Sequence, residues 1–194
     1  MPECMHFGQV ANFKTNSKIP IEKFSLALNS RLKKSIVVKS AEDVDERFHS
    51  RYLAKQKTYR YVINNSRYGT AIYRNLEYHF PIKLDVEAMK KAAKFFEGEH
   101  DFKAFKASGT SSKSSVRKIY KAEVLENNDR IFIELTGNGF LYNMVRIISG
   151  TLLDVGLGKI KPDEIQAIIE AKNREKAGRT LPAHGLYLVN VKYE

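Results

Sequence analysis

Apolar residues recur along this chain with two spacings, one typical of strands and one typical of helices. Alternating or β-branched runs predict strands at Gly8–Phe13, Ile36–Val38, Tyr59–Ile63 and Leu186–Tyr193, and a hairpin from Ile119 to Leu135 that turns at Asn127–Asp129. Helical spacing predicts helices after Pro20 (Phe24, Leu28, Leu32), after Asp85 (Val86, Met89, Ala93, Phe96), through Arg146 as far as Gly156, and after Pro162 (Ile165, Ile168, Ile169). Helices between hairpin-linked strands indicate an α+β fold, a mixed and mainly antiparallel sheet flanked by helices.

The predicted helix through Arg146 is the most informative segment, because it places one guanidinium inside a long apolar pattern that starts at Phe140. Burying an arginine is costly unless a carboxylate or phosphate accepts its charge. Tyr142, Asn143, Ser149 and Gly150 lie three or four positions away and flank Arg146 on one face. Gly150 costs about 1 kcal/mol inside a helix, so this face is expected to approach another backbone or a ligand closely. The alternative is an arginine whose head group reaches solvent at the helix edge.

Charge favours a polyanionic partner. The chain has 33 Lys and Arg against 22 Asp and Glu, a formal charge of +11, and such an excess neutralises phosphates. Composition alone does not show whether this partner is RNA, DNA or an acidic membrane surface. The alternative to a polyanionic partner is a basic surface that is merely solvated. The single Cys4 excludes a disulfide framework and a cysteine-built zinc site. With no apolar run of roughly 18 residues and no signal-peptide pattern, the cytoplasm is the expected location.

The usual catalytic motifs do not occur in the sequence. We find no glycine-rich phosphate loop before a helix, no nucleophile elbow and no histidine pair at metal-ligand spacing. The five histidines are scattered, and each is interpreted as a surface or packing residue. No metal site is predicted.

Three further segments could contact nucleic acid. Arg47, His49 and Arg51 lie among aromatic residues, which suits backbone contacts and base stacking; the alternative is a solvated basic turn with Phe48 in the core. Tyr59 and Tyr61 share one face of a strand. Either both are core residues, or one of them lies beneath a nucleobase. The serine-rich stretch 108–115 is expected to be a loop, which either closes over a phosphate backbone or only connects two elements. The candidate RNA-binding residues in and around it are Lys103, Lys106, Lys113 and Arg117.

Taken together, the motifs resemble the tRNA pseudouridine synthase I family over nearly the whole chain. Five blocks occur in the family's order, and their agreement is far more specific than any one of them. They are Gly8–Phe13; Arg47-Phe48-His49-Ser50-Arg51 with Lys57–Tyr61; His100–Phe105 with the serine-rich loop and Val116-Arg117; Asn138–Arg146; and Gly178–Leu188.

The resemblance implies isomerisation of uridine to pseudouridine in the anticodon stem-loop of tRNA, at positions 38–40, without cofactor or metal. In that family an aspartate attacks a flipped-out uridine, the glycosidic bond breaks, and the base rejoins through carbon; flipping needs a stacking platform. Tyr59 matches the tyrosine that stacks on the target base, and Arg146 matches the arginine that pairs with the catalytic aspartate. The resemblance also implies a homodimer and two ferredoxin-like halves that meet near Pro81, 1–80 being the incomplete first half and 81–194 the second.

The chain departs from the family pattern at the nucleophile. The family's aspartate lies in a Gly-Arg-Thr-Asp-x-Gly-Val-His-Ala motif just before the Gly-Gln-Val strand, and Met1–Phe7 does not supply it. Glu3, the one acid ahead of Gly8, is out of position. The expectation is a truncated synthase that is inactive alone, with a non-catalytic RNA-binding or dimerisation protein as the alternative. A misplaced start codon or a frameshift would also account for the missing motif.

Overall fold

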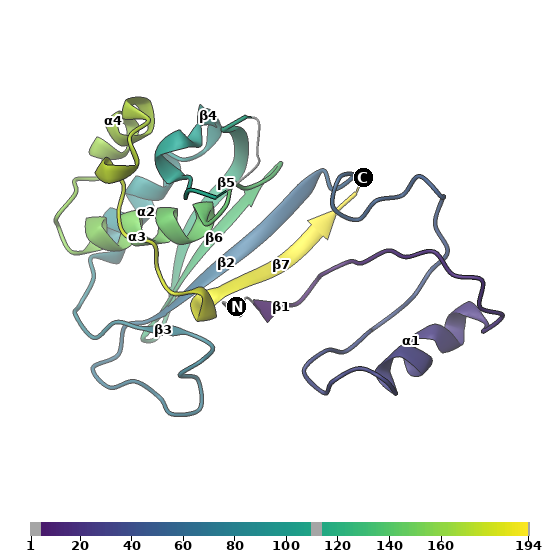
Figure 1. The fold of residues 1–194 in the computed structure, drawn as a ribbon. Helices are drawn as coiled ribbons and strands as arrows, with labels where there is room; N and C mark the ends of the chain where they lie inside the picture. The colour runs from purple at the N-terminus through teal and green to yellow at the C-terminus, as the bar shows by residue number, and fades with distance from the viewer. Residues whose placement is uncertain (1–4, 110–113, 194) are drawn as a thin grey trace. The chain divides into compact units, whose positions relative to one another are not determined.

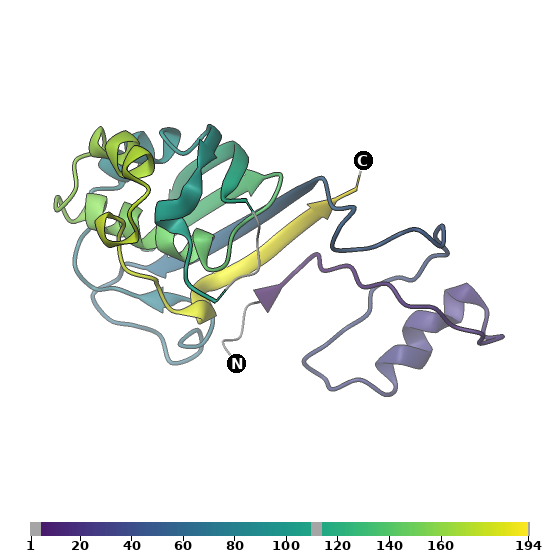
Figure 2. The ribbon, with the colours of Figure 1, turned by 45° about the horizontal axis from the view of Figure 1, so that its top comes forward.

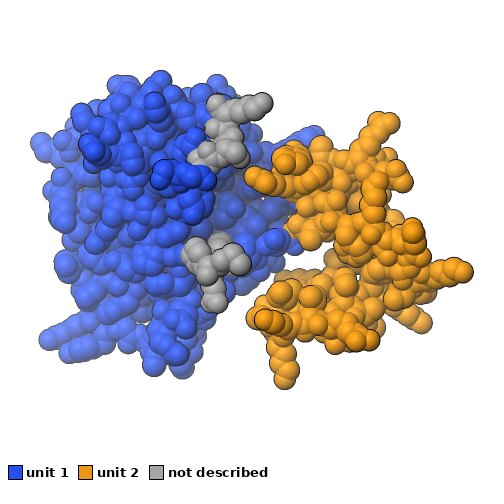
Figure 3. All heavy atoms as spheres, viewed as in Figure 1, with its two compact units in different colours: residues 1–9, 54–194 blue, residues 10–53 orange. Residues whose placement is uncertain are grey.

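The computed structural model describes residues 5–109 and 114–193, which form two compact units. One unit is Met1–Gln9 with Ala54–Glu194, and the other is Val10–Leu53; Figure 3 colours them separately. No helix among the described residues is long and apolar enough to span a membrane.

The larger unit is built on a seven-stranded sheet (Figure 1). Its strands are β1 (Met5–His6), β2 (Gln56–Asn64), β3 (Tyr78–His79), β4 (Gly98–Asp101), β5 (Val116–Asn127), β6 (Arg130–Gly137) and β7 (Leu186–Lys192). The order is β1-β7-β2-β6-β5-β4, with β3 paired to the end of β2. The β1–β7 and β2–β3 pairs are parallel and the others antiparallel, which confirms the predicted mixed, mainly antiparallel sheet.

Helices cover one face of this sheet. These helices are α2 (Val86–Lys94), α3 (Met144–Gly156) and α4 (Glu164–Ala171), with 3-10 turns η1 (Phe102–Phe105), η2 (Arg174–Lys176) and η3 (Ala183–Gly185). The smaller unit contains α1 (Ile21–Asn29). Helix α2 contacts β5, α3 contacts β2, and α4 packs beside η1 (Figure 2). The α+β architecture predicted from the sequence is therefore confirmed.

Local sequence accounts for these elements. Along β6 every second residue is buried, beginning with Ile131 and Ile133, as expected for a strand with one face on the core. The Asp85 side chain caps α2 by accepting a hydrogen bond from the backbone N–H of Ala88 at 2.9 Å. The predicted hairpin joins β5 to β6, and Asn128 adopts the left-handed conformation in its turn.

Two predicted strands are wrong, and both lie mostly in the smaller unit. Gly8–Phe13 and Ile36–Val38 have no strand conformation, and no residue between Val10 and Leu53 is buried. Strand formation requires a neighbouring edge that accepts the backbone hydrogen bonds. Instead, the Asn29 side chain bonds both backbone groups of Val38, at 2.8 and 2.9 Å. An apolar alternation without a partner edge is insufficient to make a strand.

Helix α3 begins later than its apolar pattern predicts. The pattern starts at Phe140, but Asn143 has a φ of 59° and the helix starts at Met144. All but two residues of α3 are buried, because the helix packs against β2, α2 and η1 and the segment around Gly178 lies directly on it. Tyr142 therefore precedes the helix, and its side chain is exposed.

Ser149, in the middle of α3, offers a stabilising substitution. Its side chain is fully buried, and its hydroxyl has no hydrogen-bond partner in the described part of the chain. An unsatisfied buried hydroxyl costs about 1 kcal/mol or more, so we expect Ser149→Ala to raise the free energy of unfolding by about 0.5–1 kcal/mol. Chemical denaturation of both proteins measures this difference; a loss of stability would mean that the hydroxyl has a partner.

Candidate active site

Arg146 projects from the first turn of α3 and is held by two neutral oxygens. Its Nε donates to the carbonyl of Leu181 at 2.6 Å, and its Nη1 donates to Oδ1 of Asn143 at 2.8 Å. The side chain is half-buried. Within the described residues no carboxylate forms an ion pair with it. The guanidinium is therefore fixed in orientation while its charge remains available to an anion.

Asn143 is placed by the unusual backbone just before α3. Its positive φ is tolerated by asparagine better than by most residues. The Asn138–Arg146 block thus supplies both the arginine and one of the groups that orient it. The other group, the Leu181 carbonyl, comes from the last sequence block, 35 positions away.

The segment that carries Leu181 packs directly on α3 through glycines. An added Cβ at Gly150 would lie 1.9 Å from the carbonyl oxygen of Arg179. Gly178 donates its backbone N–H to Oγ1 of Thr151 at 2.8 Å, and a Cβ there would be 2.6 Å from the Thr151 Cα. The expected close approach at Gly150 is confirmed, and its partner is a backbone.

Tyr59 lies on the helix-covered face of β2, as its register with Tyr61 predicts. Its ring is half-buried and meets Phe140 edge-on, with the centroids 5.1 Å apart. Arg60 points to the opposite face and bonds Glu134 on β6 at 2.8 Å. A half-buried aromatic ring supported by a second ring suits stacking on a planar base.

Tyr61 connects the tyrosine strand to Arg146. It is fully buried and its hydroxyl donates to the carbonyl of Pro182 at 2.7 Å, next to the Leu181 carbonyl that holds Arg146. Burial raises the pKa of the Tyr61 phenol, and the positive charge of Arg146 opposes this rise. Tyr61 and Arg146 bond the carbonyls of two consecutive residues, Pro182 and Leu181, so Arg146 lies close to the face of β2 that carries both tyrosines. Tyr61 is a core residue here, whereas Tyr59 is only half-buried.

Basic candidates of the larger unit lie near this site. Arg117 donates to the Ser114 carbonyl at 3.1 Å, and its side chain lies beside Gly139, the residue before Phe140. Lys106 ends η1 and precedes Ala107, whose N–H donates to the carbonyl of Tyr142 at 3.1 Å. The exposed Lys103 lies on the same turn. Lys113 lies outside the described residues.

The other basic candidates, Arg47, His49 and Arg51, belong to the smaller unit. The His49 and Tyr52 rings are 4.2 Å apart, and the Arg51 guanidinium lies over the Tyr52 ring at 5.6 Å. Nδ1 of His49 accepts the backbone N–H of Arg51 at 3.2 Å. His49, Arg51 and Tyr52 thus form a local basic and aromatic turn. Phe48 is half-buried.

Sequence reasoning missed one group of polar residues near the start of β3. Arg74, Tyr78 and His184 line a cavity together, although they belong to segments more than a hundred residues apart. His184 lies in the last sequence block, but nothing in the pattern marked Arg74. Neither Tyr59 nor Arg146 lines this cavity. Among the described residues, no cluster of His, Cys, Asp or Glu could hold a metal ion.

Comparison with known proteins identifies the family. The sequence profile of the tRNA pseudouridine synthase family matches residues 92–194. A protein named tRNA pseudouridine synthase A from Acetivibrio thermocellus is 56% identical over 187 residues, which are 96% of this chain and 76% of that protein.

Two further relatives carry the same name. The protein from Caldicellulosiruptor saccharolyticus is 55% identical over 186 residues, and that from Bacillus subtilis is 49% identical over 187. Each match spans 96% of this chain and 76% of the relative. Identity of this extent, together with the profile, shows that the chain belongs to the tRNA pseudouridine synthase family.

Proposed function

We propose that this chain provides the tRNA-binding and arginine-bearing part of an isomerase that converts uridine to pseudouridine in the anticodon stem-loop of tRNA. The observation that carries the proposal is the half-buried Arg146, which is oriented by two neutral oxygens and has no carboxylate partner among the described residues. A guanidinium prepared in this way suits a carboxylate nucleophile, whose charge and orientation it would stabilise. Tyr59 would stack on the uridine once it has left the helix.

The 194 residues contain no Gly-Arg-Thr-Asp sequence, so the polypeptide that they form has no matching nucleophile for Arg146. We therefore propose that these residues alone bind tRNA without isomerising it. The same observation favours the second candidate, a non-catalytic RNA-binding protein that keeps the scaffold. The two candidates differ in whether activity appears once the motif is present.

The basic side chains give this proposal a direct test. We expect the chain to bind a tRNA transcript with an affinity that falls steeply as salt rises, because Lys and Arg release counterions from phosphates. The double variant Lys106→Gln with Arg117→Gln is expected to bind about tenfold more weakly and to lower the slope of log affinity against log salt by about two. Fluorescence anisotropy at several salt concentrations measures both quantities.

A control variant separates specific from general charge effects. Lys90→Gln removes one positive charge from α2, where Lys90 pairs with Glu87 at 2.7 Å. It should leave tRNA affinity nearly unchanged. If only net charge matters, the single variant will lose about half as much log affinity as the double variant, and Lys106 and Arg117 then form no interface.

Further parts of the proposal rest on the family resemblance. Residues 1–80 and 81–194 are proposed as two related halves, a homodimer as the assembly, and the cytoplasm, where tRNA is modified, as the location. Arg47, His49 and Arg51 are proposed to contact the tRNA backbone from the smaller unit. Sedimentation equilibrium distinguishes a dimer from a monomer.

A further inference from the structure

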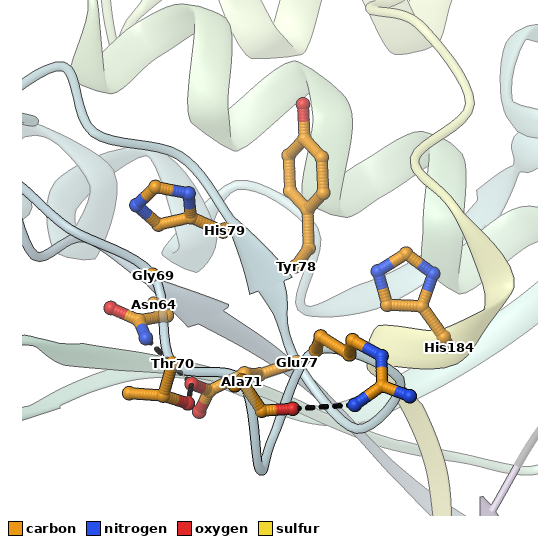
Figure 4. A pocket seen from close by; sticks show the side chains of 9 residues that line it. Asn64, Gly69, Thr70, Ala71, Glu77, Tyr78, His79 and His184 are labelled. Atoms are coloured by element: carbon orange, nitrogen blue, oxygen red, sulfur yellow. Dashed lines mark hydrogen bonds between the residues drawn. The ribbon is translucent and has the colours of Figure 1, made fainter.

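A cavity of about 450 Å³ lies between β3, with the loop that precedes it, and η3, which leads into β7 (Figure 4). The two walls come from distant segments, 64–79 and the residue His184. The cavity is lined by Asn64, Gly69, Thr70, Ala71, Arg74, Glu77, Tyr78, His79 and His184. None of these residues belongs to the Arg146 and Tyr59 site described above.

The only carboxylate in the lining is already neutralised. Glu77 is buried, and its oxygens accept from Nε of Arg130 at 2.6 Å and from Nδ2 of Asn64 at 2.6 Å. A buried carboxylate with these partners attracts no further cation strongly. The remaining ionisable groups that line the cavity are the Arg74 guanidinium, two imidazoles and the Tyr78 phenol. The lining is therefore rich in hydrogen-bond donors for an anion.

Arg74 and His79 are both held at the cavity by the loop itself. Nη1 of Arg74 donates to the carbonyl of Ala71 at 2.8 Å, which folds the side chain back over its own loop. Nε2 of His79 bonds the Ser66 carbonyl at 3.0 Å. A Cβ at Gly69 would lie 3.1 Å from Nδ1 of His79, so glycine leaves the space beside this nitrogen open.

His184 faces the cavity from the opposite wall. Figure 4 shows His79 and His184 on either side of the Tyr78 ring, and the His184 and Tyr78 centroids are 6.5 Å apart. The Tyr61 hydroxyl fixes the start of η3 through the Pro182 carbonyl. In the described part of the chain, the His184 ring has no hydrogen-bond partner. A half-buried imidazole without a partner is suited to a ligand that accepts hydrogen bonds.

We propose that this cavity binds a phosphate group of the RNA backbone, with Arg74 and His184 as its principal donors. The inference rests on the proposed function, because it assumes that RNA reaches the Arg146 site. The cavity and the Arg146 site are joined by one short segment, because Arg146 bonds the Leu181 carbonyl and His184 follows Leu181 by three residues. A nucleotide adjoining the target uridine would place its phosphate in this cavity. Binding of that phosphate would hold the RNA strand in position while the base is displaced.

Arg74→Gln tests the proposal against a matched neighbour. Arg67→Gln is the control, since Arg67 lies on the same loop, is exposed, has its guanidinium 5.3 Å above the Tyr68 ring, and does not line the cavity. The probe is a synthetic anticodon stem-loop RNA, titrated by fluorescence anisotropy at several salt concentrations. Arg74→Gln is expected to weaken binding about fivefold to tenfold and to reduce the salt slope by about one. His184→Ala is expected to weaken binding about threefold or more, because it removes one hydrogen-bond donor from the cavity.

The outcomes separate this inference from the proposed function. If the unchanged chain binds the RNA but Arg74→Gln behaves like Arg67→Gln, the phosphate site is refuted while RNA binding stands. If the unchanged chain does not bind the RNA, the proposed function fails and the RNA phosphate site fails with it. Inorganic phosphate is the second probe, followed through the His184 imidazole by NMR. A response to phosphate without RNA binding would identify a site for free phosphate and overturn the assignment to RNA.

Discussion

Gly150→Ala is expected to destabilise the protein, although alanine favours helices more than glycine does. In an open helix this substitution would gain about 1 kcal/mol. Here the new methyl group would lie 1.9 Å from the Arg179 carbonyl oxygen, and the displaced atoms would be backbone. Overpacking of this kind costs typically 1–3 kcal/mol and more when a backbone must move. We expect a net loss of about 2 kcal/mol, which lowers Tm by roughly 4–8 °C in a chain of this size.

The consequence for the site follows from what the displaced segment holds. Moving Arg179 away from α3 also moves Leu181, whose carbonyl orients Arg146. Ser149→Ala is the matched control, because it adds no atoms at the neighbouring position of the same helix. Differential scanning calorimetry compares the two. A Tm for Gly150→Ala within one degree of the unchanged protein would contradict the close packing of Gly178–Leu181 on α3.

Arg146→Lys is expected to cause the largest functional loss. The loss is measured as the rate of pseudouridine formation by a chimera, in which a segment carrying the family's Gly-Arg-Thr-Asp motif is joined directly ahead of Gly8. Lysine is a compact point charge and cannot bond the Leu181 carbonyl and Asn143 while presenting a second edge to a carboxylate. Loss of such an oriented, charge-assisted interaction costs about 3–4 kcal/mol. The rate of pseudouridine formation should therefore fall about 10²–10³-fold.

Arg60→Lys is the control for this substitution. Arg60 also bonds a partner through its guanidinium, but that partner is Glu134 on the opposite face of the sheet. The chimera with Arg60→Lys should keep most of its activity. Similar losses in the two variants would mean that Arg146 contributes only to folding.

Much of the larger unit could be predicted from the sequence, because its apolar residues pack against other apolar residues of the same chain. The α2 helix with its Asp85 cap, the β5–β6 hairpin and the inward-facing isoleucines of α4 all follow from local spacing and are confirmed. The order of the family blocks also predicts Arg146 and Tyr59 as site residues, and their roles stay a prediction. Their supporting contacts were only partly predictable, since the Leu181 carbonyl reaches Arg146 through tertiary folding.

The failures have a common physical cause. Gly8–Phe13 and Ile36–Val38 have the composition of strands, but strand formation depends on an edge that the local sequence does not specify. Leu26 and Val37, in the smaller unit, remain largely exposed. The sequence pattern does not predict the cavity beside Arg74, for a related reason. The two walls of the cavity become neighbours only when β3 and η3 both flank the end of β2. Sequence patterns indicate helices and strands, whereas pockets arise where those helices and strands pack together.

We propose that Arg146 and Tyr59 form one part of a tRNA uridine isomerase site whose nucleophile is not among these 194 residues. Pseudouridine formation in a tRNA anticodon stem-loop tests it most directly, with the 194-residue polypeptide and the chimera assayed side by side. We expect the polypeptide to bind the RNA without forming pseudouridine, and the chimera to form pseudouridine. Pseudouridine formed by the 194-residue polypeptide, or none formed by a folded chimera that binds the RNA, would contradict it.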